Sequence, residues 1–147
     1  CGYNRFRNKK IGFLIKQVFY LHEQHLNKQF SKFGLTASQT FTLIYLFKSH
    51  DKGISVNQKD IEKELDISNP TVTGILNRLE VKGLITRVPC RHDARAKNIE
   101  VTEKALELDK QLRIVFQQSD EKLVESLSKE EIDNLQSYLI KILRSNS

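Results

Sequence analysis

Apolar residues recur at helical spacing near the start of the chain. From Ile11 to about Phe33 they stand three or four positions apart, with polar residues between them. This period predicts a long amphipathic helix. Gly34 is expected to end it, because glycine readily adopts the left-handed conformation found just beyond many helices.

A second helical pattern follows in the stretch LTASQTFTLIYLF. Thr36 and Gln39 stand three positions apart and match a capping box, so the helix is expected to begin after Thr36. Its apolar residues would lie on nearly every side of such a helix, and they are Phe41, Leu43, Ile44, Tyr45, Leu46 and Phe47. We therefore expect this helix to be buried on several sides, as part of the core.

A shorter helix is predicted over residues 57–66, which read NQKDIEKELD. Asn57 is a favourable N-cap, and an acidic residue in the first turn stabilises the positive end of the helix dipole. Ile61 and Leu65 stand four positions apart and are expected to face inward.

The stretch SNPTVTGILNRLEVKGLI predicts a further helix, with Ser68 or Asn69 as its cap and Gly83 at its end. Its apolar face consists of Val72, Ile75, Leu76 and Leu79. The remaining surface is polar and nearly uncharged, and it carries Asn69, Pro70, Thr71, Thr73, Gly74, Asn77 and Arg78. A plain surface helix usually carries Glu and Lys. Small hydroxyl and amide side chains instead suit contacts with base edges in a DNA major groove.

Two short helices joined by a tight turn, the second with such a face, indicate a helix-turn-helix. The segments LITRV and NIEVT then predict two strands, with RHDARAKN, residues 91–98, as the hairpin loop between them. A strand pair in this place is typical of a winged helix. The cations of this wing, Arg91, Arg95 and Lys97, are suited to contacting phosphates, and Arg95 also to entering a minor groove.

Positive charge is concentrated in the same part of the chain. The net charge is +6 at pH 7. Residues 68–97 hold six Lys or Arg against two acidic residues, whereas residues 103–147 hold seven against nine. The N-terminal stretch CGYNRFRNKK is a second basic segment and a candidate DNA-gripping arm. This distribution favours a polyanionic partner for the middle of the chain.

The last part of the chain predicts two helices, one over residues 103–127 after the cap Thr102, and a final one that begins at a capping box of Ser128 and Glu131. The apolar stripes of the first and final helices exceed what a winged core alone would cover. This favours a homodimer, and packing of the first helix on the last within one chain is the alternative.

The chain resembles the MarR family of bacterial transcription regulators. The stretch SNPTVTGILNRLEVKGLITRVPCRHDARAKNIEVT is similar to that family's recognition helix, its Leu-Glu-x-x-Gly-Leu-Ile link and its Asp-x-Arg wing, here Asp93 and Arg95. LTASQ and NQKDIEKELDIS look like its second and third helices. The wing departs from the usual pattern at Pro89, Cys90 and His92, where many relatives carry Arg or Ser.

The resemblance covers essentially the whole chain and implies a mostly α fold, a winged helix-turn-helix with long N- and C-terminal dimerisation helices. It implies a single domain over residues 1–147. The DNA-binding lobe is expected at 36–102, and the dimerisation helices at 1–33 and 103–147.

The implied function is sequence-specific regulation of transcription, as a repressor that binds double-stranded DNA and responds to a small aromatic or phenolic effector. A homodimer would place two recognition helices in successive major grooves of a pseudo-palindromic operator. The expected DNA-binding residues are Ser68, Asn69, Pro70, Thr71, Thr73, Asn77, Arg78, Arg91, Arg95 and Lys97. Asp93 would repel phosphate and is expected to hold the wing, through Arg95 or a backbone amide.

The sequence also offers candidates for two regulatory features, an effector pocket and a reactive thiol. An effector would bind between the DNA-binding lobe and the dimer helices. The candidate pocket residues, for which ordinary packing is the alternative, are His22, His25, Tyr45 and Arg113. Cys90, with Arg91 and His92 beside it, is a candidate redox-active thiol.

Other classes of protein are disfavoured. No apolar run approaches the about 20 residues of a membrane span, and no secretory signal opens the chain, so a cytoplasmic protein is expected. The sequence offers no catalytic or phosphate-binding motif and no convincing set of metal ligands, so we expect no enzyme, cofactor or metal. A winged helix that binds protein is the other alternative, but its recognition face would tend to be apolar or acidic.

Overall fold

The computed structural model describes residues 5–93 and 95–147, which form helices interrupted by one β-hairpin. The elements are α2 (Ile11–Lys32), α3 (Ala37–Asp51), α4 (Gln58–Leu65), α5 (Asn69–Val81), β1 (Ile85–Pro89), β2 (Lys97–Val101), α6 (Glu103–Leu123) and α7 (Lys129–Ser145). Cys1, the rest of the first four residues and the wing residue at position 94 lie outside this description. None of the described helices is both long and apolar enough to cross a bilayer.

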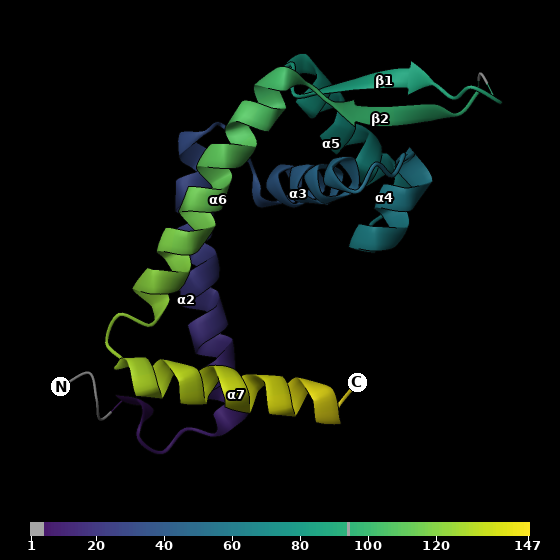
Figure 1. Ribbon diagram of the computed structural model, residues 1–147. Coiled ribbons are helices and arrows are strands. Elements are labelled where there is room, and N and C mark those ends of the chain that lie inside the picture. The colour runs from purple at the N-terminus through teal and green to yellow at the C-terminus, as the bar shows by residue number, and fades with distance from the viewer. Residues whose placement is uncertain (1–4, 94) are drawn as a thin grey trace.

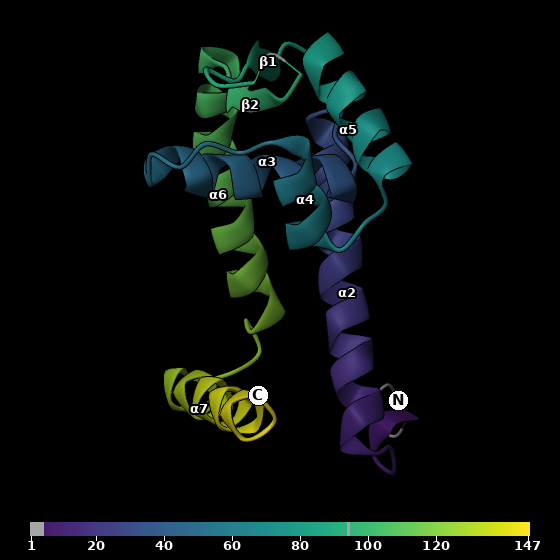
Figure 2. The same cartoon turned by 90° about the vertical axis from the view of Figure 1, so that its right-hand side faces the viewer.

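The elements are arranged as a lobe carried on two long helices. Helices α3, α4 and α5 and the hairpin gather at one end of the molecule, and α2 and α6 run from there towards the other end (Figure 1). Helix α7 lies at that far end, and Figure 2 shows it apart from α2. The mostly α winged helix-turn-helix with long flanking helices is thus confirmed.

Local capping signals place the starts of three helices where the sequence predicts them. The Thr36 hydroxyl accepts from the Gln39 amide at 3.2 Å, and the Gln39 side chain accepts from the Thr36 amide at 3.3 Å. The same reciprocal pair of bonds joins Asn57 with Asp60 at the start of α4, and a third box starts α7. Gly34 follows the end of α2 with a positive φ of 71°, as its expected role requires.

Helix α6 is shorter than predicted. It ends at Leu123 instead of continuing to residue 127. Val124, with a φ of −112° and a ψ of 15°, already departs from helical backbone angles, and Ser128 is extended, with a ψ of 166°, to cap α7. The amide of Leu127 therefore bonds back only to the carbonyl of Val124, at 3.0 Å, in a turn between the two helices.

The hairpin and the start of α5 also differ in detail from the prediction. Both strands are shifted by one residue, since β1 covers 85–89 instead of 84–88 and β2 covers 97–101 instead of 98–102, so that Pro89 pairs with Lys97. Ser68 occupies the N-cap position of α5, but its side chain caps no backbone amide.

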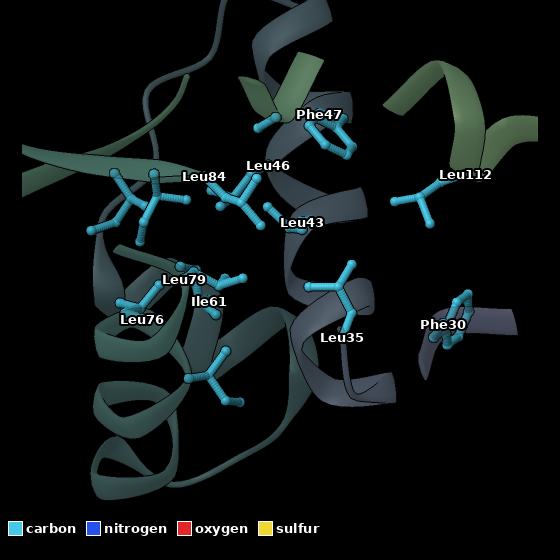
Figure 3. Packing of buried hydrophobic residues seen from close by; sticks show 14 of the residues in the cluster. Phe30, Leu35, Leu43, Leu46, Phe47, Ile61, Leu76, Leu79, Leu84 and Leu112 are labelled. Atoms are coloured by element: carbon cyan, nitrogen blue, oxygen red, sulfur yellow. The ribbon is translucent and has the colours of Figure 1, made fainter. Parts of the chain in front are cut away.

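The core fills the space between α3 and the helix-turn-helix and continues on the other side of α3. Figure 3 shows Ile61, Leu76 and Leu79 on one side of α3, and Phe30 and Leu112 approaching from the other. All five are at most 1% exposed. These contacts confirm that α3 is largely buried, because it lies between two packed layers.

Phe41 is the exception on α3, since 44% of its surface is exposed. Its ring meets that of Phe30 edge to face, with 6.1 Å between centroids. The expectation that α3 is buried on several sides is therefore wrong for this residue, because neither packed layer extends over it.

Candidate nucleic-acid interface

Helix α5 divides into a buried and an exposed side, as its sequence pattern predicts. Val72, Leu76 and Leu79 are fully buried, and Ile75 is 4% exposed. Asn69, Pro70, Thr71, Asn77 and Arg78 are exposed, while Thr73 and Gly74 are half-buried. The shallow hollow beside its C-terminal half is lined by Asn77, Arg78, Val81 and Lys82. The polar side chains expected to face DNA thus lie on one accessible surface.

Several of these side chains are already hydrogen-bonded within the protein. The Thr73 hydroxyl donates to the carbonyl of Asn69 at 2.9 Å and accepts from Gln58 Nε2 at 2.8 Å. Ser68 and Thr71 share a hydrogen bond of 2.9 Å between their hydroxyls. Thr73 therefore has its donor occupied, and its methyl group and one acceptor lone pair remain for a ligand.

The two asparagines on this face are held by charged neighbours. Asn69 Nδ2 donates to Glu62 Oε2 at 3.2 Å, so a carboxylate of α4 takes part of its donor capacity. Asn77 Oδ1 accepts from Arg87 Nη2 at 2.8 Å. Gln58, Glu62 and Arg87 were not among the predicted interface residues, because nothing local in the sequence indicates which residues of α5 they meet.

The wing places its cations at the surface. Arg91, Arg95 and Lys97 are exposed, beyond or at the end of the paired strands. Asp93 Oδ1 accepts from the backbone amide of Arg95 at 2.9 Å, which uses one carboxylate oxygen inside the wing. Such a bond from an aspartate to the amide two residues later stabilises a turn.

The base of the wing is tied to the rest of the lobe. The amide of Ile99 in β2 donates to the carbonyl of Val56 at 2.7 Å, just before α4. Near the loop, Cys90 is half-buried and its thiol donates to Asn98 Oδ1 at 3.2 Å. The hairpin is therefore attached to the helix-turn-helix by backbone pairing.

Lys82, which follows α5, connects this lobe to the long helices. Its ammonium donates to the carbonyl of Gly34 and to Gln39 Oε1, the latter at 2.9 Å. The ammonium of Lys104, on α6, donates to the carbonyl of Lys82 at 2.7 Å. Beside these contacts lies a hollow of about 550 Å³, lined by Phe33, Gly34, Lys82, Leu84, Lys104, Glu107, Leu108 and Gln111.

The four side chains considered for an effector pocket do not line this hollow, and the structure does not bring them together. His25 Nδ1 is 2.9 Å from the hydroxyl of the buried Ser119, so it connects α2 with α6. Burial is the main cause that lowers the pKa of His25, and the nearby Lys122 contributes in the same direction. His22 Nε2 lies 3.8 Å from Asp120 Oδ1.

The other two candidates lie elsewhere. Arg113 is largely exposed and forms ion pairs with Asp109 at 3.0 Å and Asp51 at 3.2 Å. The pKa of Tyr45 is raised, first because the phenol is partly buried and then because Asp60 lies nearby. Within residues 5–93 and 95–147, no three His, Cys, Asp or Glu side chains are grouped as metal ligands would be.

A polar helix face beside a basic hairpin, on a helix-turn-helix, defines a winged-helix protein of the nucleic-acid-binding class. A model of the MarR family matches residues 33–96. The chain is 29% identical to MepR, a transcription regulator of the Staphylococcus aureus multidrug efflux pump MepA, over 95% of this chain and 100% of that one, with a TM-score of 0.84.

Two further solved structures agree. The S. aureus MepR–DNA complex is 31% identical over 94% of this chain and 99% of that one, with a TM-score of 0.73. Wild-type MarR from E. coli, in its apo form, is 25% identical over 92% of this chain and 98% of that one, with a TM-score of 0.77. The chain belongs to the MarR family of winged-helix, DNA-binding transcription regulators.

Proposed function

We propose that this protein binds a pseudo-palindromic operator as a homodimer and represses transcription from it. The observation that carries the proposal is the accessible polar face of α5 next to the exposed cations of the wing. Helix α5 would enter a major groove, and Arg91, Arg95 and Lys97 would contact the flanking phosphates or minor groove. The DNA-binding lobe would span residues 36–102.

The homodimer is supported by apolar surface at the far end of the molecule. Helix α7 has no buried residue, although Leu139, Ile142 and Leu143 lie along it. On α2, Ile11 is 67% exposed and Phe19 63% exposed. A second copy would bury these faces, so residues 1–33 and 103–147 would form the dimer and fix the distance between the two α5 helices.

Regulation would act at the junction between the lobe and the long helices. The hollow beside Lys82 and Lys104 is bounded by the ends of α2 and α5 and the start of α6. A small aromatic or phenolic effector bound there would change how the lobe sits on α6, and so the spacing of the two recognition helices. Release of labelled operator by a series of phenols and phenolic acids would test this part of the proposal.

The main test is selection of bound duplexes from a random library at roughly 150 mM salt, where non-specific binding is weakened. We expect the wild type to enrich a two-fold pseudo-palindrome. Asn77→Ala should change the preferred base at one position of each half-site, because Asn77 is a base-reading residue. Arg95→Ala should weaken binding to all duplexes and reduce the salt slope by about 1 for each bound wing, because it removes a phosphate contact.

Lys129→Ala is the matched control, since Lys129 is an exposed cation at the start of α7, away from the lobe. It should leave the affinity and the salt slope as in the wild type. If a folded wild-type protein enriches no sequence, or if Arg95→Ala and Asn77→Ala both bind as the wild type does, the proposed interface is wrong.

A further inference from the structure

Arg87 restrains one of the exposed side chains of the recognition helix. Its Nη2 atom lies 2.8 Å from Asn77 Oδ1. A guanidinium has only donors, so the atom of Asn77 that faces it has to be the amide oxygen. The opposite orientation of the amide would place an NH₂ group against Arg87. The contact therefore determines which end of the Asn77 amide points away from the protein.

Arg87 is itself held in place from two directions. It lies in the middle of β1, opposite Ile99 of β2, and its side chain is 23% exposed. Its Nε atom is buried and forms no hydrogen bond within the described residues, but it lies at an ion-pair distance of 3.7 Å from Glu80 Oε2. Asn77 and Glu80 are three positions apart on α5 and thus share one side of the helix. The guanidinium lies across both, so it can keep the Asn77 oxygen engaged while DNA is bound.

The other end of the Asn77 amide has no such partner. Within the described part of the chain, no hydrogen bond from Asn77 Nδ2 to a protein acceptor is formed, and the residue is exposed. Asn77 also lines the hollow on the accessible side of α5, together with Arg78 and Val81. It therefore presents hydrogen-bond donors to whatever lies against this surface, while its amide oxygen, which could accept a second bond, is turned towards Arg87.

This restriction matters for base recognition. An asparagine that binds adenine uses both ends of its amide: the oxygen accepts from N6 and the nitrogen donates to N7. In the major groove, guanine and thymine present the keto acceptors O6 and O4, whereas adenine and cytosine present amino donors. An amide that presents its NH₂ group finds only acceptors on guanine and a keto acceptor on thymine, whereas on adenine it can donate to N7 but leaves the N6 amino group unmatched.

We infer that Arg87 is a specificity-determining positioning residue, which makes Asn77 favour guanine or thymine over adenine. The inference rests on the proposed function, because it requires α5 to lie in a major groove. Arg87 acts through Asn77 and needs no contact with DNA of its own. Its role is to hold the amide oxygen turned towards β1, away from the position that a two-bond adenine contact would require.

The test uses the random-library selection on the full-length protein, with the relevant position identified as the one whose preference Asn77→Ala removes. The wild type should favour guanine or thymine there by about 5- to 100-fold, the range that a good base contact provides. Arg87→Met keeps the aliphatic stem but donates no hydrogen bond, so the amide becomes free to turn. The preferred base should then shift towards adenine.

Three further variants separate this role from a general effect of charge or folding. Arg87→Lys retains a donor and should keep the keto preference. Arg78→Met removes a neighbouring exposed cation and should weaken all duplexes without changing the preferred base. Asn77→Asp has no donor at neutral pH and still pairs with Arg87, so it should lose the keto preference in favour of cytosine. This last variant tests the inference even if Arg87→Met fails to fold.

The inference is overturned if the wild type selects adenine or cytosine at that position, if Asn77→Ala changes no position, or if a folded Arg87→Met keeps the keto preference. Retention of that preference by Asn77→Asp would also overturn it. In each of these cases the wild type still enriches a palindrome and the proposed function stands. A folded wild type that enriches no sequence contradicts the proposed function itself.

Discussion

At the scale of single residues, several polar side chains in this protein are held in one orientation by a hydrogen-bond partner on another segment of the chain. Thr73 on α5 is hydrogen-bonded to Gln58 on α4. Lys82, at the end of α5, is hydrogen-bonded to Gln39 on α3. His25 is another example, because its ring contacts Ser119 on α6. Such contacts fix the side chain's orientation, and in the case of His25 they accompany a shift in its titration.

The pKa of His25 is lowered from the ordinary value of a histidine, chiefly because the ring is buried. The unfolded chain therefore binds the proton more readily than the folded one. Above the unfolded pKa this histidine is neutral in both states and adds no pH dependence. As the pH falls below about 6.5, the proton favours the unfolded state and the free energy of unfolding decreases.

We expect His25→Asn to reduce this loss of stability on acidification, because it removes the titrating ring while keeping a polar group near Ser119. The measurement is the thermal midpoint of both proteins at intervals between about pH 8 and pH 5.5, a range in which histidine is the main side chain that titrates. Identical pH dependence in the two proteins would contradict the assignment.

At the scale of elements, short local signals set where the helices begin, and the shortest helix depends on its signal most. Helix α4 has 8 residues, and isolated helices of that length are unstable in water. Its first turn is closed by two hydrogen bonds of 2.9 Å between Asn57 and Asp60. Gln58, the residue that contacts Thr73 on α5, lies in this first turn. The cap therefore supports both the helix and the recognition face.

Asn57→Ala should lower the free energy of unfolding by about 1 kcal/mol, because it leaves the amide of Asp60 without its capping acceptor. Urea denaturation at a fixed protein concentration measures this change. Ser55→Ala is the control, since Ser55 is exposed just outside the helix, and it should unfold as the wild type does. Equal stability of Asn57→Ala and the control would mean that the capping box contributes nothing here.

At the scale of the whole molecule, the distribution of apolar surface points to a second copy of the chain. The lobe has its own core around α3, whereas α7 has no buried residue and the first half of α2 exposes most of its apolar side chains. These uncovered faces lie at the end of the molecule away from the wing (Figure 1). A dimer formed there would leave both recognition helices accessible.

Phe19→Asp should shift the protein from a dimer, with twice the chain mass of 17.1 kDa, towards a monomer. It places a carboxylate where an apolar contact is expected, and unpaired buried charge is costly. Light scattering at micromolar concentration measures the mass, and operator affinity should fall with it because a monomer contacts one half-site. Gln24→Asp introduces the same charge on the opposite side of α2 and should remain dimeric. A monomeric wild type would refute the dimer.

Much of this architecture could be predicted from the sequence alone, because it depends on relationships within a few residues. The capping boxes at Thr36, Asn57 and Ser128 and the glycine after α2 determine where helices start and stop. The apolar period of α5 determines which of its sides is buried, and the basic loop between two short strands marks the wing. Family membership could be inferred from the same motifs, since they are contiguous in the chain.

The tertiary structure decided what those local patterns do not encode. Local patterns do not determine the end of α6, the exposure of Phe41 or the pairing of the strand residues. These features depend on neighbouring elements and on packed layers formed by distant segments of the chain. The partners of the interface residues belong here too: Asn77 meets Arg87, and Lys82 meets the carbonyl of Gly34. A periodic pattern determines the direction of a side chain, but its hydrogen-bond partner depends on the path of the whole backbone.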